Sequence, residues 1–235
     1  MLKVSRSPGN KAEIFFSIQG EGINAGKPAV FIRLALCNLK CSWCDTKYTW
    51  DWPSGEADQH YTEMQQDQIE AAISGYSCKY FVATGGEPLL QQKDLIPLLG
   101  RLQDRGFFVE IETNATVVPD NDLLTRVDHW SVSPKLSSSA NLGKLREVPE
   151  CYRLFAYINN SHFKFVIQNG NDLDELLSNV NKYHIPADKI ILMPESQSRE
   201  ELLVKSRELV EICKVHDFRF SIRLQTLLWG NERGK

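Results

Sequence analysis

The chain has 235 residues, of which 42% are hydrophobic and 24% charged, and its formal net charge at pH 7 is −3. This indicates a globular protein with a sizeable core, for which we expect a single domain over residues 1–235, and it excludes the basic footprint of a nucleic-acid binder. No run approaches the roughly 18 apolar residues of a membrane span, and residues 1–11 lack the apolar segment of a signal peptide, so we expect a cytoplasmic protein without a membrane partner.

Short apolar runs alternate with helical patterns along the chain. The apolar runs predict buried strands at residues 29–36, 80–83, 108–111, 163–167, 190–193 and 218–224, with a seventh ending at Ser133. Apolar residues spaced i, i+3, i+4 and i+7 from Leu95 and from Leu173 predict two amphipathic helices. Capping-box patterns at Thr62/Gln65 and Ser198/Glu201 predict two helix starts.

This strand–helix alternation predicts an α/β fold with a mostly parallel sheet. Six or seven strands are too few for a closed eight-stranded barrel, so we expect a partial (β/α) barrel. In such folds the carboxyl ends of the strands carry the chemistry.

Three of the six cysteines, Cys37, Cys41 and Cys44, lie within one loop directly after the first predicted buried strand. Closely spaced thiolates bind zinc or iron–sulfur clusters. Three ligands leave one coordination position open, which suits a reactive centre better than a structural one. A zinc site completed by a remote Cys or His is the alternative, in a protein that would then be a zinc-bound interaction module.

Polar residues follow the predicted strands at several points. The turn at residues 84–88 (TGGEP) has adjacent glycines that let a ligand approach the backbone, and Glu87 offers a carboxylate to an amine. Residues 112–114 (ETN), 133–135 (SPK) and 193–196 (MPES) occupy equivalent positions. Lys135 and the Ser133 hydroxyl are suited to a carboxylate.

The CxxxCxxC spacing, with Trp43 before the last cysteine and GGE at residues 85–87, resembles the radical S-adenosylmethionine superfamily. The resemblance implies a 4Fe-4S cluster on Cys37, Cys41 and Cys44, whose free iron is chelated by S-adenosylmethionine. It implies that the cofactor carries the radical chemistry, with no catalytic side chain. The residues expected to bind S-adenosylmethionine are Trp43, Gly85, Gly86, Glu87, Glu112, Ser133, Pro134, Lys135, Met193, Pro194, Glu195 and Ser196.

Motifs along essentially the whole chain resemble the 7-carboxy-7-deazaguanine synthase family. They lie at residues 16–22, 26–33, 44–46, 84–88, 112–114, 133–135 and 227–234. The resemblance implies a lyase that contracts 6-carboxy-5,6,7,8-tetrahydropterin to 7-carboxy-7-deazaguanine with loss of ammonia, in 7-deazapurine (queuosine-type) biosynthesis. It also implies a homodimer and a flavodoxin or ferredoxin as electron donor.

The same resemblance implies a magnesium ion on Thr46, which a single protein oxygen can hold because Mg²⁺ keeps most of its waters. It implies substrate contacts from Ile18, Gln19, Gly20, Glu21, Arg33, Thr84 and Lys235, where Arg33 would bind the substrate carboxylate. This chain has Gln225 where the family commonly has a histidine.

A glycyl-radical-activating enzyme shares the CxxxCxxC spacing and is a second enzymatic alternative. It would not need the segment at residues 18–22, and it often carries extra cluster cysteines. Cys78, Cys151 and Cys213 are too dispersed for such an insert, so we expect them to be buried packing residues.

Overall fold

The computed structural model describes residues 1–7, 9–230 and 232. Among these residues, ten strands form one open sheet in the order β10-β9-β8-β7-β6-β5-β3-β1-β4, with β2 paired to β3. The strands are β1 (Leu2–Ser5), β2 (Ile14–Ile18), β3 (Pro28–Leu34), β4 (Tyr61–Met64), β5 (Tyr80–Gly85), β6 (Phe108–Thr113), β7 (His129–Val132), β8 (Ser161–Ile167), β9 (Ile190–Pro194) and β10 (Arg219–Phe220). From β3 to β10 every pairing is parallel, while β1, β2 and β4 pair antiparallel. The predicted mostly parallel, open sheet is confirmed.

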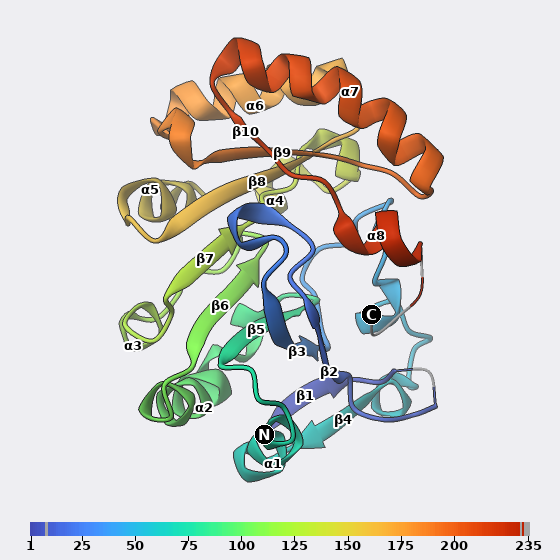
Figure 1. Ribbon diagram of the computed structural model, residues 1–235, viewed down its shortest axis with the longest axis vertical. Helices are drawn as coiled ribbons and strands as arrows, with labels where there is room; N and C mark the ends of the chain where they lie inside the picture. The colour runs from blue at the N-terminus through green and yellow to red at the C-terminus, as the bar shows by residue number, and fades with distance from the viewer. Residues whose placement is uncertain (8, 231, 233–235) are drawn as a thin grey trace.

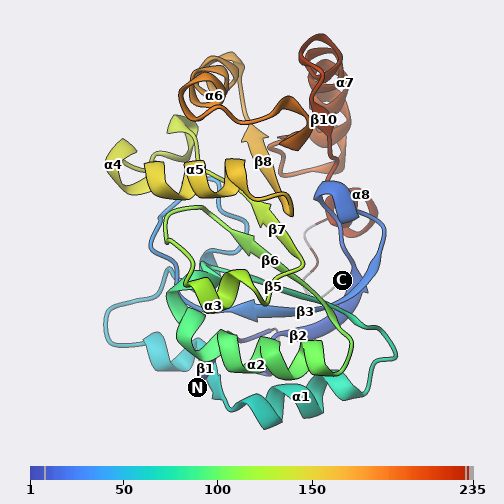
Figure 2. The ribbon, with the colours of Figure 1, turned by 90° about the vertical axis from the view of Figure 1, so that its left-hand side faces the viewer.

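The helices of the described part of the chain are α1 (Gln66–Ser74), α2 (Gln92–Asp104), α3 (Asn121–Leu124), α4 (Gly143–Arg146), α5 (Pro149–Tyr157), α6 (Gly170–Tyr183), α7 (Arg199–His216) and α8 (Leu224–Trp229). Figure 1 shows α2, α3 and α5 along the outer side of the curved sheet, and α8 on its inner side. Turned by 90°, Figure 2 shows α1, α2, α3 and α5 facing the viewer in front of the strands. The two helices predicted from the leucine spacing are α2 and α6.

The parallel strands sort their side chains by parity, because successive residues of a strand point to opposite faces. On the helix-covered face lie buried apolar residues such as Ile32, Ala83, Ile111, Trp130 and Phe165, all members of one core. The opposite face holds a small second apolar cluster of Ala29, Phe31, Tyr80 and Val82. Beyond that cluster, towards the carboxyl ends, the inner face turns polar.

Two of the predicted boundaries are wrong. In the run at 218–224 only Arg219 and Phe220 pair with β9, and the chain then leaves the sheet edge so that the Leu224 N–H bonds to Gly20 O. Thr62 is not a helix cap, because it pairs with Val4 inside β4. Helix α1 instead begins after Gln65, whose side chain forms the capping box with Gln68.

The predicted start of α7 is confirmed. The Ser198 side chain accepts the Glu201 N–H at 3.2 Å, and the Glu201 carboxylate accepts the Gln197 N–H at 3.0 Å. The short antiparallel strands β1, β2 and β4 were not predicted from the sequence.

None of the helices in the described part of the chain combines the length and apolar character that a bilayer crossing requires.

Adjacent leucines at the start of α7 provide a test of the packing. Leu202 is fully buried, whereas Leu203 is 42% exposed. We expect Leu202→Ala to lower the free energy of unfolding by about 2–5 kcal/mol, because it leaves a cavity in the core. Leu203→Ala, the matched control, should cost about 1 kcal/mol or less. Urea denaturation measures both, and equal losses would contradict the packing described.

Candidate functional site

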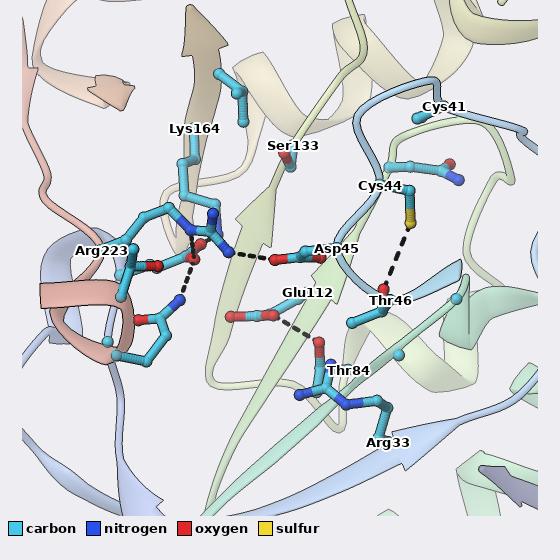
Figure 3. Close-up of a pocket in the computed structure, with 18 of the residues that line it drawn as sticks. Arg33, Cys41, Cys44, Asp45, Thr46, Thr84, Glu112, Ser133, Lys164 and Arg223 are labelled. Atoms are coloured by element: carbon cyan, nitrogen blue, oxygen red, sulfur yellow. Dashed lines mark hydrogen bonds and ion pairs between the residues drawn. The ribbon is translucent and has the colours of Figure 1, made fainter. Parts of the chain in front are cut away.

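A cavity of about 570 Å³ opens at the carboxyl ends of the parallel strands. Its wall includes Arg33 at the end of β3, Thr84 and Gly85 at the end of β5, and Glu112 on β6. Ser133, Lys164 and Met193 continue it along β7, β8 and β9. Figure 3 shows side chains from these strands, the cysteine loop and the C-terminal segment pointing towards one another. The predicted position of the site at the strand ends agrees with this geometry.

The three cysteines of the loop all line the cavity, and all three are free thiols. Burial raises the pKa of the Cys37 thiol to about 11 and also raises the pKa of Cys41. Metal binding must therefore displace protons from these thiols at neutral pH. No group of three His, Cys, Asp or Glu side chains within the described residues is arranged to hold a metal ion. The donor chemistry nevertheless fits a cluster, since the thiolates of a cluster bind different iron atoms rather than one.

The glycine turn after β5 brings the backbone of β5 and β3 together. Gly85 has φ +131°, and a Cβ there would lie 2.1 Å from Leu34 O. A Cβ on Gly86 would lie 2.0 Å from Leu36 O, one residue before Cys37. These two positions therefore require glycine, and both line the cavity.

The Glu87 carboxylate is held by its own turn and by the end of β6. It is fully buried and accepts hydrogen bonds from Leu89 N, Asn114 N and the Thr113 hydroxyl at 2.7–3.0 Å. Burial raises the pKa of this carboxyl despite those bonds. Glu87 thus caps the turn after β5 and is not among the residues that line the cavity, and its contact with an amine stays a prediction.

The remaining residues predicted to bind S-adenosylmethionine divide into two groups. Lys135 donates to the Ser133 hydroxyl at 2.9 Å and lies over the Trp43 ring, 5.7 Å from its centroid. Those that line the cavity are Trp43, Gly85, Gly86, Glu112, Ser133, Lys135, Met193 and Glu195. Pro134, Pro194 and Ser196, although described, are not part of its wall.

The described residues that are predicted to contact substrate lie in the wall of the same cavity. Ile18, Gln19, Gly20, Glu21, Arg33 and Thr84 all line the cavity, as does Thr46. Arg33 and Thr84 are register partners on β3 and β5. Glu13 accepts the Arg33 Nε–H at 3.0 Å, which leaves the guanidinium four further N–H groups to offer a carboxylate. Lys235 lies outside the described residues.

A buried network of hydrogen bonds holds the Gln19 side chain in place. Its amide donates to Glu110 at 2.8 Å and to Glu112 at 3.2 Å, and Glu112 also accepts the Thr84 hydroxyl. Glu110 further accepts from Asn24 and the Tyr80 hydroxyl, and His129 Nδ1 lies 2.8 Å away. Glu110 and His129 are register partners on β6 and β7.

Sequence reasoning identified Arg33 and Lys135 but missed two other cations that line the cavity, Lys164 and Arg223. Lys164 on β8 forms an ion pair with Glu21. Arg223 pairs with Glu21 at 3.3 Å and with Asp45 of the cysteine loop. Burial by itself raises the pKa of the Glu21 carboxyl, but Lys164 and Arg223 outweigh it and lower that pKa to about 2. The signal for Lys164 was present in the alternation of β8, where His162 and Lys164 are separated by Phe163 in a largely apolar strand.

Gln225 lies beside Glu21 in the wall of the cavity. Its Nε2 donates to Glu21 Oε1 at 2.6 Å, and its side chain packs so tightly on Gly20 that a Cβ there would lie 1.9 Å from Gln225 Oε1. The side chain also lines the cavity. Gly22 N donates to Ser221 Oγ at 2.8 Å, so the segment before α8 holds residues 20–22 in place.

The described chain matches known proteins over most of its length. A model of the Radical SAM superfamily matches residues 32–138. A 7-carboxy-7-deazaguanine synthase of Pyrobaculum aerophilum is 39% identical over 95% of this chain and 96% of the relative. That of Halobacterium salinarum is 32% identical over 93% of this chain and 90% of the relative. The match to the crystal structure of QueE from Escherichia coli covers 95% of this chain and 94% of the QueE chain, with a TM-score of 0.71 and 26% sequence identity.

His162 provides a pH test of the inner face. Burial, together with nearby His129, Arg219 and Lys189, lowers its pKa to about 4. As the pH falls below about 6.5 the unfolded chain binds a proton that the folded chain does not, so stability falls until about pH 4. Between these pH values we expect the free energy of unfolding of His162→Gln to fall by roughly 1–2 kcal/mol less than that of the parent, a figure that allows for solvent screening of a half-buried group.

Urea denaturation at both ends of that pH range measures the loss. His184→Asn is the control, because His184 is exposed at the end of α6 with φ +54° and asparagine tolerates this conformation. A His162→Gln protein whose stability falls with pH as steeply as the parent's would contradict the assignment.

Proposed function

Because the chain belongs to the 7-carboxy-7-deazaguanine synthase family of radical S-adenosylmethionine enzymes, we propose that its cavity contracts the ring of 6-carboxy-5,6,7,8-tetrahydropterin to 7-carboxy-7-deazaguanine with loss of ammonia. One observation carries the assignment to this cavity. The cysteine loop and the segment at residues 18–21, which lie on opposite sides of β3 in the sequence, line the same space. The whole chain, residues 1–235, then acts as one radical S-adenosylmethionine domain.

Cys37, Cys41 and Cys44 would hold the 4Fe-4S cluster, and the cavity residues around Gly86, Ser133, Lys135 and Glu195 would bind S-adenosylmethionine. When bound, these two cofactors supply hydrogen-atom abstraction by a 5′-deoxyadenosyl radical. Nucleophilic or acid–base side chains are then not needed, and the protein contributes position and water exclusion.

The substrate would lie between Arg33 and the residue 18–21 segment. Arg33, held by Glu13, presents a planar set of donors that matches the substrate carboxylate. Gln19 and Glu112, already fixed by one another, present amide and carboxylate groups to the edge of the pterin ring. Thr46 would place its hydroxyl on a magnesium ion that also touches the substrate carboxylate.

Further features remain predictions from the sequence. They are the contact of the Lys235 carboxylate with substrate, the homodimer, the flavodoxin or ferredoxin donor and the cytoplasmic location. Gln225 offers an amide where the family commonly has a histidine, and its bond to Glu21 supports a role in positioning that carboxylate.

The reaction is tested with anaerobically reconstituted protein, S-adenosylmethionine, magnesium, dithionite and 6-carboxytetrahydropterin, with mass spectrometry of the product. We expect 7-carboxy-7-deazaguanine from the parent and none from Cys41→Ala, which should also lose bound iron. Cys213→Ala is the control, since Cys213 is a buried residue of α7 that does not line the cavity. Formation of 5′-deoxyadenosine without the product would show that the substrate assignment is wrong.

Magnesium is tested separately with Thr46→Val, which removes the hydroxyl and keeps the shape. Even the loss of an outer-shell partner typically costs about 10–100-fold in metal affinity, so for a direct ligand we expect at least about a tenfold rise in the Mg²⁺ concentration needed for half-maximal rate. Thr125→Val, at the end of α3 away from the cavity, should leave that concentration unchanged. An unaltered Mg²⁺ dependence in Thr46→Val would remove Thr46 from the site.

A further inference from the structure

Each sulfur of the cysteine loop has a side-chain N–H group directed at it from another part of the chain. None of these donors comes from the residues between the cysteines. The three pairs are Trp50 Nε1 and Cys44 Sγ at 3.4 Å, Asn141 Nδ2 and Cys41 Sγ at 3.2 Å, and Asn114 Nδ2 and Cys37 Sγ at 4.0 Å.

The Trp50 contact is unambiguous, because an indole nitrogen can only donate. Trp50 follows the short 3-10 turn Lys47–Thr49, and its backbone N–H is fixed by Lys47 O at 3.0 Å. Thr49 O in turn accepts the Leu36 N–H at 2.8 Å, which ties this turn to the start of the cysteine loop. The indole is therefore held against Cys44 by the backbone on both sides.

The orientation of the Asn141 amide is fixed by its other contacts. Its oxygen accepts the Lys40 N–H at 2.8 Å, so its nitrogen must face Cys41. The segment that carries Asn141 also binds the loop through Ser139 O, which accepts the Ser42 N–H at 3.0 Å. The Asn141 amide thus bonds to both a backbone N–H group and a cysteine sulfur of the loop.

Asn114 is the weakest of the three donors. Its nitrogen donates to Asn38 at 3.1 Å, and its oxygen accepts the Thr116 N–H at 3.0 Å. The amide is therefore oriented correctly, but 4.0 Å to Cys37 is a long contact. Trp50 and Asn141 carry the argument.

We propose that Trp50 and Asn141 set the reduction potential of the cluster by donating hydrogen bonds to two of its thiolates. The inference rests on the proposed function, since it needs a cluster on these three cysteines. When one electron passes from an external reductant to the cluster, the cluster gains one negative charge. An N–H group aimed at a ligand sulfur stabilises the more negative, reduced form more than the oxidised form, so each donor raises the potential.

The test is an EPR-monitored redox titration of the reconstituted enzyme, with dithionite and mediators and without S-adenosylmethionine. Trp50→Phe keeps an aromatic ring and removes the N–H. We expect its reduction equilibrium to shift about two- to tenfold towards the oxidised form, where tenfold corresponds to about 59 mV for one electron. Trp52→Phe is the matched control, because the Trp52 indole donates to Tyr48 O at 2.7 Å and not to a sulfur. Its potential should equal that of the parent.

Asn141→Asp is the second variant, since a carboxylate still accepts the Lys40 N–H and can no longer donate to Cys41. Asn38→Asp introduces the same charge into the same loop, and we expect Asn141→Asp to lower the potential further than Asn38→Asp does. A fully loaded Trp50→Phe enzyme with the potential of the parent would overturn the inference. If the Trp50→Phe protein loses its iron, equal reduction potentials in Asn141→Asp and Asn38→Asp would overturn the inference instead.

Iron content separates this failure from failure of the proposed function. A parent protein that assembles no four-iron cluster, or a Cys41→Ala protein that retains one, would contradict the proposed function and the inference together. A loaded parent with unmoved potentials in the variants would contradict the inference alone.

Discussion

The alternation of side chains along the parallel strands is the constraint on which the rest of the structure depends. Each strand from β3 to β9 must be apolar on the face that the helices cover, which leaves only every second residue free to serve the cavity. Glu110 and Glu112 are separated by Ile111 for this reason, as His162 and Lys164 are by Phe163. Register then brings partners together across strands, so that Glu110 meets His129 and Arg33 meets Thr84.

Polar groups on a buried face are costly unless each is paired. Glu110 and Glu21 on the inner face meet this condition with networks rather than isolated bonds. Glu110 is 1% exposed and takes donors from Gln19, Asn24 and Tyr80. Glu21 depends on Lys164 and on Arg223, which arrives from the opposite end of the chain. The C-terminal segment is therefore part of the wall of the site as well as its cover.

The sequence predicted the class of sheet, the helices α2 and α6, and most of the strands, because long periodic patterns report local burial directly. It also predicted the cavity position of the cysteine loop and of Gln19, Arg33 and Thr84. It failed where pairing is decided by segments distant in the sequence. The short strands β1 and β4 form by pairing with each other, and the run after β10 leaves the sheet because the Leu224 N–H bonds to Gly20 O. The hydrogen bonds of Glu87 with its own turn and with the end of β6 could not be predicted either, because a motif gives the position of a carboxylate and not the direction in which its side chain points.

Lys164 and Arg223 were missed for a related reason. Lys164 and Arg223 become recognisable only when Glu21 is placed between them, and the three residues span most of the chain. Their pairing has a consequence for the chemistry. Glu21 is ionised and held by Lys164, Arg223 and Gln225 before any ligand arrives, so this part of the wall is arranged during folding rather than during binding. A radical reaction that relies on position more than on acid–base groups gains most from such a site, because a misplacement of about 1 Å can cost about 10²-fold in rate.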